Sequence, residues 1–276
     1  MKHNLRITFL LILLFLSSHF IGLFIIKHYL PKDQELPLNI EKPEFEEKTS
    51  YIPLIITILL ATGLALILIR FKAFKIWKFW FLISVFVTLS IAFSAFIFEK
   101  LAIFIALTLA IWKTFKPNLY IHNLTEIFIY GGLAAIFVPV LNVFSIIILL
   151  ILISIYDAIA VWKTKHMISM AKFQSESNIF AGLLIPYKSE KKIKVKEKIS
   201  SGSQAILGGG DIGFPLLFSG VMLKLFGYIP AIITSLTAAL ALFTLFLLAE
   251  KKKFYPAMPF ITVGCLIGYL IVRIIL

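Results

Sequence analysis

Two aspartates interrupt long apolar stretches of this 276-residue chain, and they are the residues best placed to do chemistry. Asp157 follows Tyr156 near the end of one apolar run, and Asp211 follows the glycine run 208–210 near the start of another. A charged residue costs about 2.5–3.5 kcal/mol at the centre of a membrane helix on insertion scales, so such residues usually serve a function. The remaining aspartate, Asp33, lies in a polar segment.

Two carboxylates that share a site can hold one proton between them, so that one acts as a base while the other acts as an acid. One carboxylate can then deprotonate a water molecule while the other protonates a peptide carbonyl or the leaving nitrogen. This chemistry needs neither a metal ion nor a nucleophilic side chain. Because the two groups titrate as a pair, the acid and base roles are not assigned separately to Asp157 and Asp211.

The elements that carry these aspartates are predicted to be membrane-spanning helices. Hydrophobic residues make up 60% of the chain, and most of it falls in apolar runs of about 17–23 residues, enough to cross a bilayer core. The first run is too long for a secretory signal and lacks a small-residue cleavage site, so it is expected to stay as a helix. The predicted fold class is an all-α polytopic membrane protein with about nine transmembrane helices, at residues 6–26, 51–69, 79–98, 100–115, 120–139, 142–162, 204–226, 228–249 and 256–275.

The predicted spans place the two aspartates at similar depth. Asp157 lies six residues before Lys163, and Asp211 lies seven residues after Gln204. At a helical rise of 1.5 Å per residue, these separations correspond to depths of about 9 and about 10 Å from the same side of the membrane. Two neighbouring antiparallel helices would therefore bring the aspartates together.

The formal net charge of +13 is explained by membrane orientation. Twenty of the 27 Lys and Arg residues fall in segments on the same side as the N-terminus, so the positive-inside rule predicts a cytoplasmic N-terminus and an external C-terminus. Nucleic acid is accordingly not expected as a partner. Cys265 is the only cysteine and the five histidines are scattered, so no disulfide, metal site or cofactor is expected.

The chain divides into an N-terminal membrane half, residues 1–162, a basic loop, residues 163–203, and a C-terminal membrane half, residues 204–276. The loop contains an apolar patch at 179–186 and a strictly alternating segment at 192–199. Alternation is typical of a strand, which would pair with an extended peptide. The alternative is a solvated juxtamembrane loop drawn to anionic lipid.

Two further features have both a structural and a functional interpretation. Glu126, near His122 and Asn123, is expected to have an interfacial or pairing role rather than a catalytic one. The two prolines of Pro256-Ala257-Met258-Pro259 open the last apolar run. They either mark an ordinary helix start or leave backbone groups free to bind a peptide.

Three motifs, in their order along the chain, resemble the signatures of the presenilin and signal peptide peptidase family of intramembrane aspartyl proteases. The helix count and order are also similar, and the predicted orientation resembles presenilin. Together with the small size and short loops, this points to a prokaryotic, archaeal presenilin homologue. The motifs are Tyr156-Asp157, Gly208-x-Gly210-Asp211 and Pro256-Ala257-Met258.

The resemblance implies that Asp157 and Asp211 are the catalytic pair. It also implies that the active site is shaped, and the substrate positioned, by the other motif residues: Tyr156, Gly208, Gly210, Pro256, Ala257 and Met258. The family usually has Leu where this chain has Met258, a change of similar volume that affects fine specificity more than activity. Family members engage substrate as an extended strand, which favours the strand interpretation of residues 192–199.

The predicted function is an endopeptidase that hydrolyses peptide bonds within transmembrane segments of other proteins. The expected partners are such substrates and the lipid bilayer, with a homo-oligomer left open. The main alternative is a proton-coupled transporter or channel that uses both aspartates as a proton relay, although the sequence lacks the internal repeats common in such folds. A catalytically silent relative acting as a membrane chaperone is the third alternative.

Overall fold

The structure is a computed structural model that describes most of the chain outside the basic loop. The described residues are 4–31, 34–43, 45–164, 170, 173–174, 177, 179–187, 204–250 and 255–275. The alternating segment 192–199, for which a strand was considered, lies outside them.

The described residues form nine α-helices, which confirms the predicted all-α membrane fold. Eight of these helices are long and apolar enough to cross a membrane by length and composition, if α6 is counted together with the π-helical turn that continues it to Lys163, and α4 is slightly shorter. Most helices begin and end within a few residues of the predicted spans. They are α1 (Leu5–Tyr29), α2 (Tyr51–Arg70), α3 (Phe74–Ser94), α4 (Glu99–Phe115), α5 (Leu119–Phe137), α6 (Val143–Ala158), α8 (Gly209–Phe226), α9 (Tyr228–Leu248) and α10 (Met258–Ile275).

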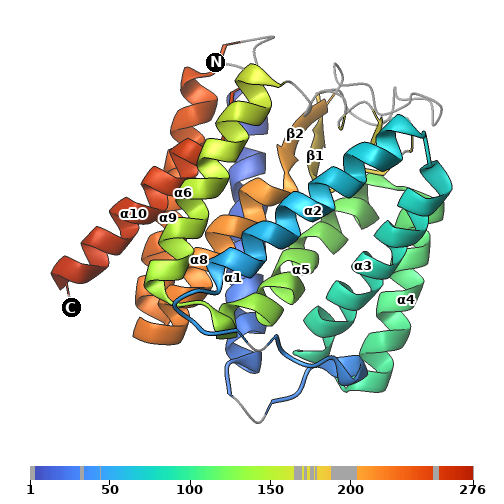
Figure 1. Ribbon diagram of the computed structural model, residues 1–276, viewed down its shortest axis with the longest axis horizontal. Coiled ribbons are helices and arrows are strands. Elements are labelled where there is room, and N and C mark those ends of the chain that lie inside the picture. The colour runs from blue at the N-terminus through green and yellow to red at the C-terminus, as the bar shows by residue number, and fades with distance from the viewer. Residues whose placement is uncertain are drawn as a thin grey trace.

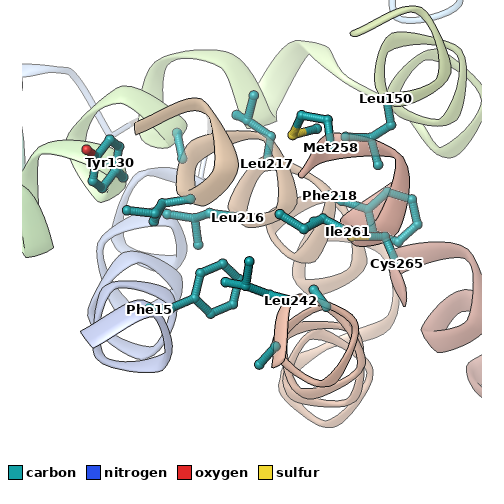
Figure 2. Close-up of a cluster of buried hydrophobic side chains, with 14 of the residues drawn as sticks. Phe15, Tyr130, Leu150, Leu216, Leu217, Phe218, Leu242, Met258, Ile261 and Cys265 are labelled. Carbon is teal, nitrogen blue, oxygen red and sulfur yellow. The ribbon is translucent and has the colours of Figure 1, made fainter. Parts of the chain in front are cut away.

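Helix α8 lies at the centre of the bundle, in contact with α1, α5, α6, α9 and α10 (Figure 1). Every residue from 215 to 223 of α8 is buried, as expected for a helix that is apolar on all sides. Figure 2 shows Leu216 and Phe218 of α8 in one cluster with Phe15 of α1 and Leu242 of α9. This packing fixes the helix that carries Asp211.

The outer helices have the opposite character. Only Leu54, Ala65 and Leu68 of α2 are buried, and apolar side chains such as Ile56 and Leu60 are exposed. In a membrane these side chains would contact lipid tails. The helices that carry the aspartates pack mainly against α1, α5, α9 and α10, and α2 adds a smaller contact with α6.

A two-stranded antiparallel sheet precedes α8, at one end of the bundle (Figure 1). It consists of β1 (Gly182–Pro186) and β2 (Gln204–Gly208), with Gly182 opposite Gly208 and Pro186 opposite Gln204. Strand β1 coincides with part of the apolar patch predicted at 179–186.

The sheet corrects the predicted start of the seventh span. The helix begins at Gly209 rather than at Gln204, so Asp211 is the third residue of α8. The depth of about 10 Å derived from a helical rise is therefore wrong, because strand residues advance about 3.3 Å each. A short apolar run does not distinguish strand from helix by periodicity alone, and here pairing with β1 selects the strand.

Candidate active site

Asp157 lies in the last turn of the α-helical part of α6, where the helix changes to a π-helical turn at Ile159–Lys163. Single π-helical turns are rare and often occur at functional sites. The side chain is partly buried. Its Oδ2 atom accepts a hydrogen bond of 3.1 Å from the backbone N–H of Met258, and the backbone of Ala257 lies close to the carboxylate.

This contact explains the position of the proline motif at the start of a helix. Helix α10 begins at Met258, so Pro256 precedes the helix and Pro259 lies in its first turn, where proline is well tolerated. The first N–H groups of a helix have no intrahelical acceptor and favour a negative charge. The proline motif is therefore an ordinary helix start that also leaves backbone N–H groups free of intrahelical partners. The Met258 N–H is one of these groups, and it binds Asp157.

Asp211 lies in the first turn of α8 and is partly buried. Its carboxylate lies against the backbone of Gly208, with Oδ2 3.2 Å from the position that a Cβ atom would take there, and close enough to Asp157 for the two charges to interact. Pro215, four residues later, has no N–H to donate to the Asp211 carbonyl. The structure thus brings the two sequence-predicted aspartates and Pro256–Met258 to one place.

The glycines before Asp211 differ in how closely they are approached. A Cβ atom at Gly208 would lie 3.2 Å from Oδ2 of Asp211, and one at Gly209 would lie 2.8 Å from the Tyr130 hydroxyl. At Gly210 the nearest atom would be 3.5 Å away, on Phe214, which is an ordinary contact. Close approach therefore accounts for Gly208 and Gly209, but not for Gly210.

Tyr156, the remaining sequence-predicted site residue, directly precedes Asp157 on α6 and is partly buried. It therefore lies beside the site.

Polar residues of α5 hold strand β1, and this arrangement was not predicted. Asn123 both donates to the Leu184 carbonyl, at 2.7 Å, and accepts from the Leu184 N–H, at 3.0 Å. His122 bonds to the carbonyl of Gly182 at 2.7 Å through Nε2. The sequence signal was the His122, Asn123 and Glu126 spacing, which places all three on one side of a helix.

Glu126 also has the pairing role that was expected of it. Its Oε1 atom lies 2.6 Å from Nζ of Lys113 on α4, and Oε2 accepts from the Gly182 N–H at 3.0 Å. From the sequence, Lys113 was counted only among the basic residues on the cytoplasmic side of the membrane, yet it is buried.

The comparisons with known proteins agree with this architecture. The family model described as signal-peptide peptidase, presenilin aspartyl protease matches residues 12–276. Two solved structures match over nearly the whole chain, both described as a presenilin family intramembrane aspartate protease. The one in space group C222 has a TM-score of 0.62 at 17% identity, covering 95% of this chain and 94% of that chain. The one in space group P2 has a TM-score of 0.65 at 18% identity, covering 96% and 97%. No curated protein matches by sequence.

Proposed function

Because the chain belongs to the signal-peptide peptidase and presenilin aspartyl protease family, we propose that Asp157 and Asp211 are its catalytic pair. The protein is a multi-pass membrane protease, and the proposal concerns how it acts. The observation that carries it is the meeting of Asp157, Asp211 and the backbone of Pro256–Met258 at one place.

The reaction follows from one proton shared by the pair. The ionised carboxylate takes a proton from a water molecule, and the oxygen of that water attacks the peptide carbonyl, whose oxygen is protonated by the other carboxyl group. In the second step the leaving nitrogen takes a proton from the pair, one hydroxyl of the tetrahedral diol returns a proton to the pair, and the C–N bond breaks to give the acid and the amine. The backbone N–H of Met258 would keep the Asp157 carboxylate in place during these transfers, and the backbone of Gly208 lies against the Asp211 carboxylate.

An extended substrate segment fits the edge of β2 that faces away from β1, where no other strand pairs with it among the described residues. Side chains of α5 bind the backbone of Gly182 and Leu184, so by strand alternation Leu183 and Ile185 pair with β2. The backbone groups of Ile206 and Gly208 then point to the opposite edge, and the Asp211 carboxylate lies beside Gly208. A transmembrane substrate must unwind before its carbonyls become accessible, and this edge would hold the unwound segment beside the aspartates.

The remaining motif residues are assigned supporting roles. Tyr156, Gly210, Pro256 and Ala257 would shape the walls around the substrate, and Met258 would act mainly through its backbone N–H. Each membrane half contributes one aspartate, Asp157 from residues 1–162 and Asp211 from residues 204–276.

The N-terminus is assigned to the cytoplasm and the C-terminus to the outside. Cys265 is buried, so single cysteines can be introduced and labelled without interference. An impermeant maleimide added to right-side-out vesicles should label Glu41→Cys and spare Lys72→Cys. Labelling of Lys72→Cys alone would reverse the assigned orientation.

The function is tested with a reporter that contains one transmembrane segment, reconstituted with the protein in liposomes. The expected result is a cut within the segment, located by mass spectrometry, and inhibition by a hydroxyl-bearing transition-state analogue. Proton flux across the liposome membrane without any cut would instead favour the transporter alternative.

A further inference from the structure

A buried ion pair joins two helices next to the site. Lys113 on α4 and Glu126 on α5 are 2.6 Å apart, with side chains only 1% and 2% exposed. The ammonium group also bonds to Thr125 Oγ1 at 2.9 Å and to the His122 carbonyl at 3.3 Å. Burial of two charges costs free energy that the pair only partly recovers, so such a pair is weak evidence for a purely stabilising role.

The second carboxylate oxygen of Glu126 extends from the ion pair to the strand that supports the site. Oε2 accepts from the Gly182 N–H at 3.0 Å, and it also accepts from the Tyr130 hydroxyl. Gly182 lies opposite Gly208, where β2 ends and the glycine run begins. The carboxylate therefore holds the sheet at the level of the glycine run.

Tyr130 carries the connection to α8. A Cβ atom added at Gly209 would lie only 2.8 Å from the Tyr130 hydroxyl. A Cβ atom added at Gly213 would lie 3.7 Å from the Tyr130 ring. Gly209 and Gly213 are on either side of Asp211 in the first turns of α8. Glu126 thus reaches the segment around Asp211 by two routes, through β1 and through Tyr130.

We propose that Glu126 is a positioning residue for the reaction, with Lys113 as its charge partner. Its carboxylate ties β1 to α5 and orients Tyr130 against the start of α8, and so fixes the place of Asp211 and of the β2 edge. This inference rests on the proposed proteolytic function. It makes α4, which carries Lys113, part of the support of the active site.

Two double variants separate positioning from stability. The pair Lys113→Met with Glu126→Leu removes both charges and also the acceptor for Gly182 and Tyr130. The pair Lys113→Met with Glu126→Gln removes the same charges but keeps one acceptor oxygen. Both variants remove the two charges together, so neither leaves an unpaired charge buried, and both proteins should fold.

The expected result is a fall in kcat of about tenfold to a hundredfold for the Leu-containing double variant, since small displacements of catalytic groups have effects of this size. The Gln-containing variant should recover part of that loss at a similar Tm. Backbone amides at 182–185 and 204–208 should exchange hydrogen faster in the first variant than in the second. Equal kcat and equal exchange in the two variants would overturn the inference.

The control is Glu47→Gln, which breaks the ion pair between Glu47 and Lys224 at 2.9 Å. This pair is partly exposed and lies at the other end of α8, so kcat and strand exchange should stay within about twofold of the wild type. The exchange measurement needs no turnover. A wild type that cleaves nothing would therefore count against the proposed function, while the two double variants would still decide whether Glu126 holds the strands.

Discussion

Asp157 at the end of α6 and Met258 at the start of α10, 101 residues apart in the chain, are joined by a hydrogen bond of 3.1 Å. The donor is the backbone N–H of Met258, so the contact does not depend on the type of side chain at this position. This explains how the chain can have Met where related proteins usually have Leu. The Pro-Ala-Met motif thus lies where the start of α10 meets a carboxylate.

The effect of a substitution at Met258 on kcat should therefore depend on whether the backbone N–H is kept. Met258→Leu keeps the N–H and a similar volume, so kcat should change by less than about twofold. Met258→Pro removes the N–H at a helix position that tolerates proline, and loss of a hydrogen bond to a charged group, about 1.5–3 kcal/mol, should lower kcat at least about tenfold. The measurement is reporter cleavage per folded enzyme. Equal losses in both variants would show that the side chain, not the N–H, matters.

The contact between Gly209 and Tyr130 predicts that a substitution at Tyr130 will restore activity lost by a substitution at Gly209. Gly209→Ala would place a Cβ atom 2.8 Å from the Tyr130 hydroxyl, so one of the two must shift, and kcat should fall about tenfold or more. Adding Tyr130→Phe removes that nearest atom and should restore part of the loss.

The comparison requires the single variant Tyr130→Phe, which should lose less activity than Gly209→Ala. Reporter cleavage by all three variants gives the answer in one experiment. If the double variant is no more active than Gly209→Ala alone, the hydroxyl is not what excludes a side chain at Gly209.

Stability of the bundle should depend on close contact between α3 and α5. A Cβ atom at Gly132 on α5 would collide with the backbone carbonyl of Thr88 on α3, and small residues allow such close helix approach in membranes. Gly132→Ala should destabilise the fold by about 1–3 kcal/mol, the usual cost of overpacking. Thermal unfolding in detergent should show a lower Tm.

Gly63→Ala is the matched control, because a Cβ atom at Gly63 on α2 would have nothing within 4 Å. The Tm of this variant should stay the same or rise slightly, since alanine favours helix over glycine. An unchanged Tm for Gly132→Ala would contradict the close packing of α3 and α5.

The fold was largely predictable because membrane spans are defined by length and apolar character alone. Helix α2 is mostly exposed and α8 mostly buried, yet both are apolar throughout and both were predicted. The start of α8 was predicted wrongly for the same reason, because the segment Gln204–Gly208 continues the apolar run of the helix that follows. Only the partner strand Gly182–Pro186, far earlier in the chain, makes this segment a strand.

The catalytic candidates were predictable for a related reason. A carboxylate in an apolar run is unusual, so Asp157 and Asp211 were evident from the sequence. The support of the site was not, because Lys113 lies near a helix end and resembles the many lysines that set orientation. Its burial depends on the position of Glu126 on another helix, and a pair across two helices has no fixed spacing in sequence.

The central claim is that Asp157 and Asp211 together perform the hydrolysis. Reporter cleavage in liposomes by the wild type, Asp157→Asn and Asp211→Asn tests it most directly, because asparagine keeps the shape but neither takes nor gives the proton. We expect each single variant to retain the Tm of a folded protein and to lose cleavage by at least about a thousandfold, as expected when one member of a cooperating catalytic set is removed. Cleavage at the wild-type rate by either folded variant would contradict the two-aspartate mechanism.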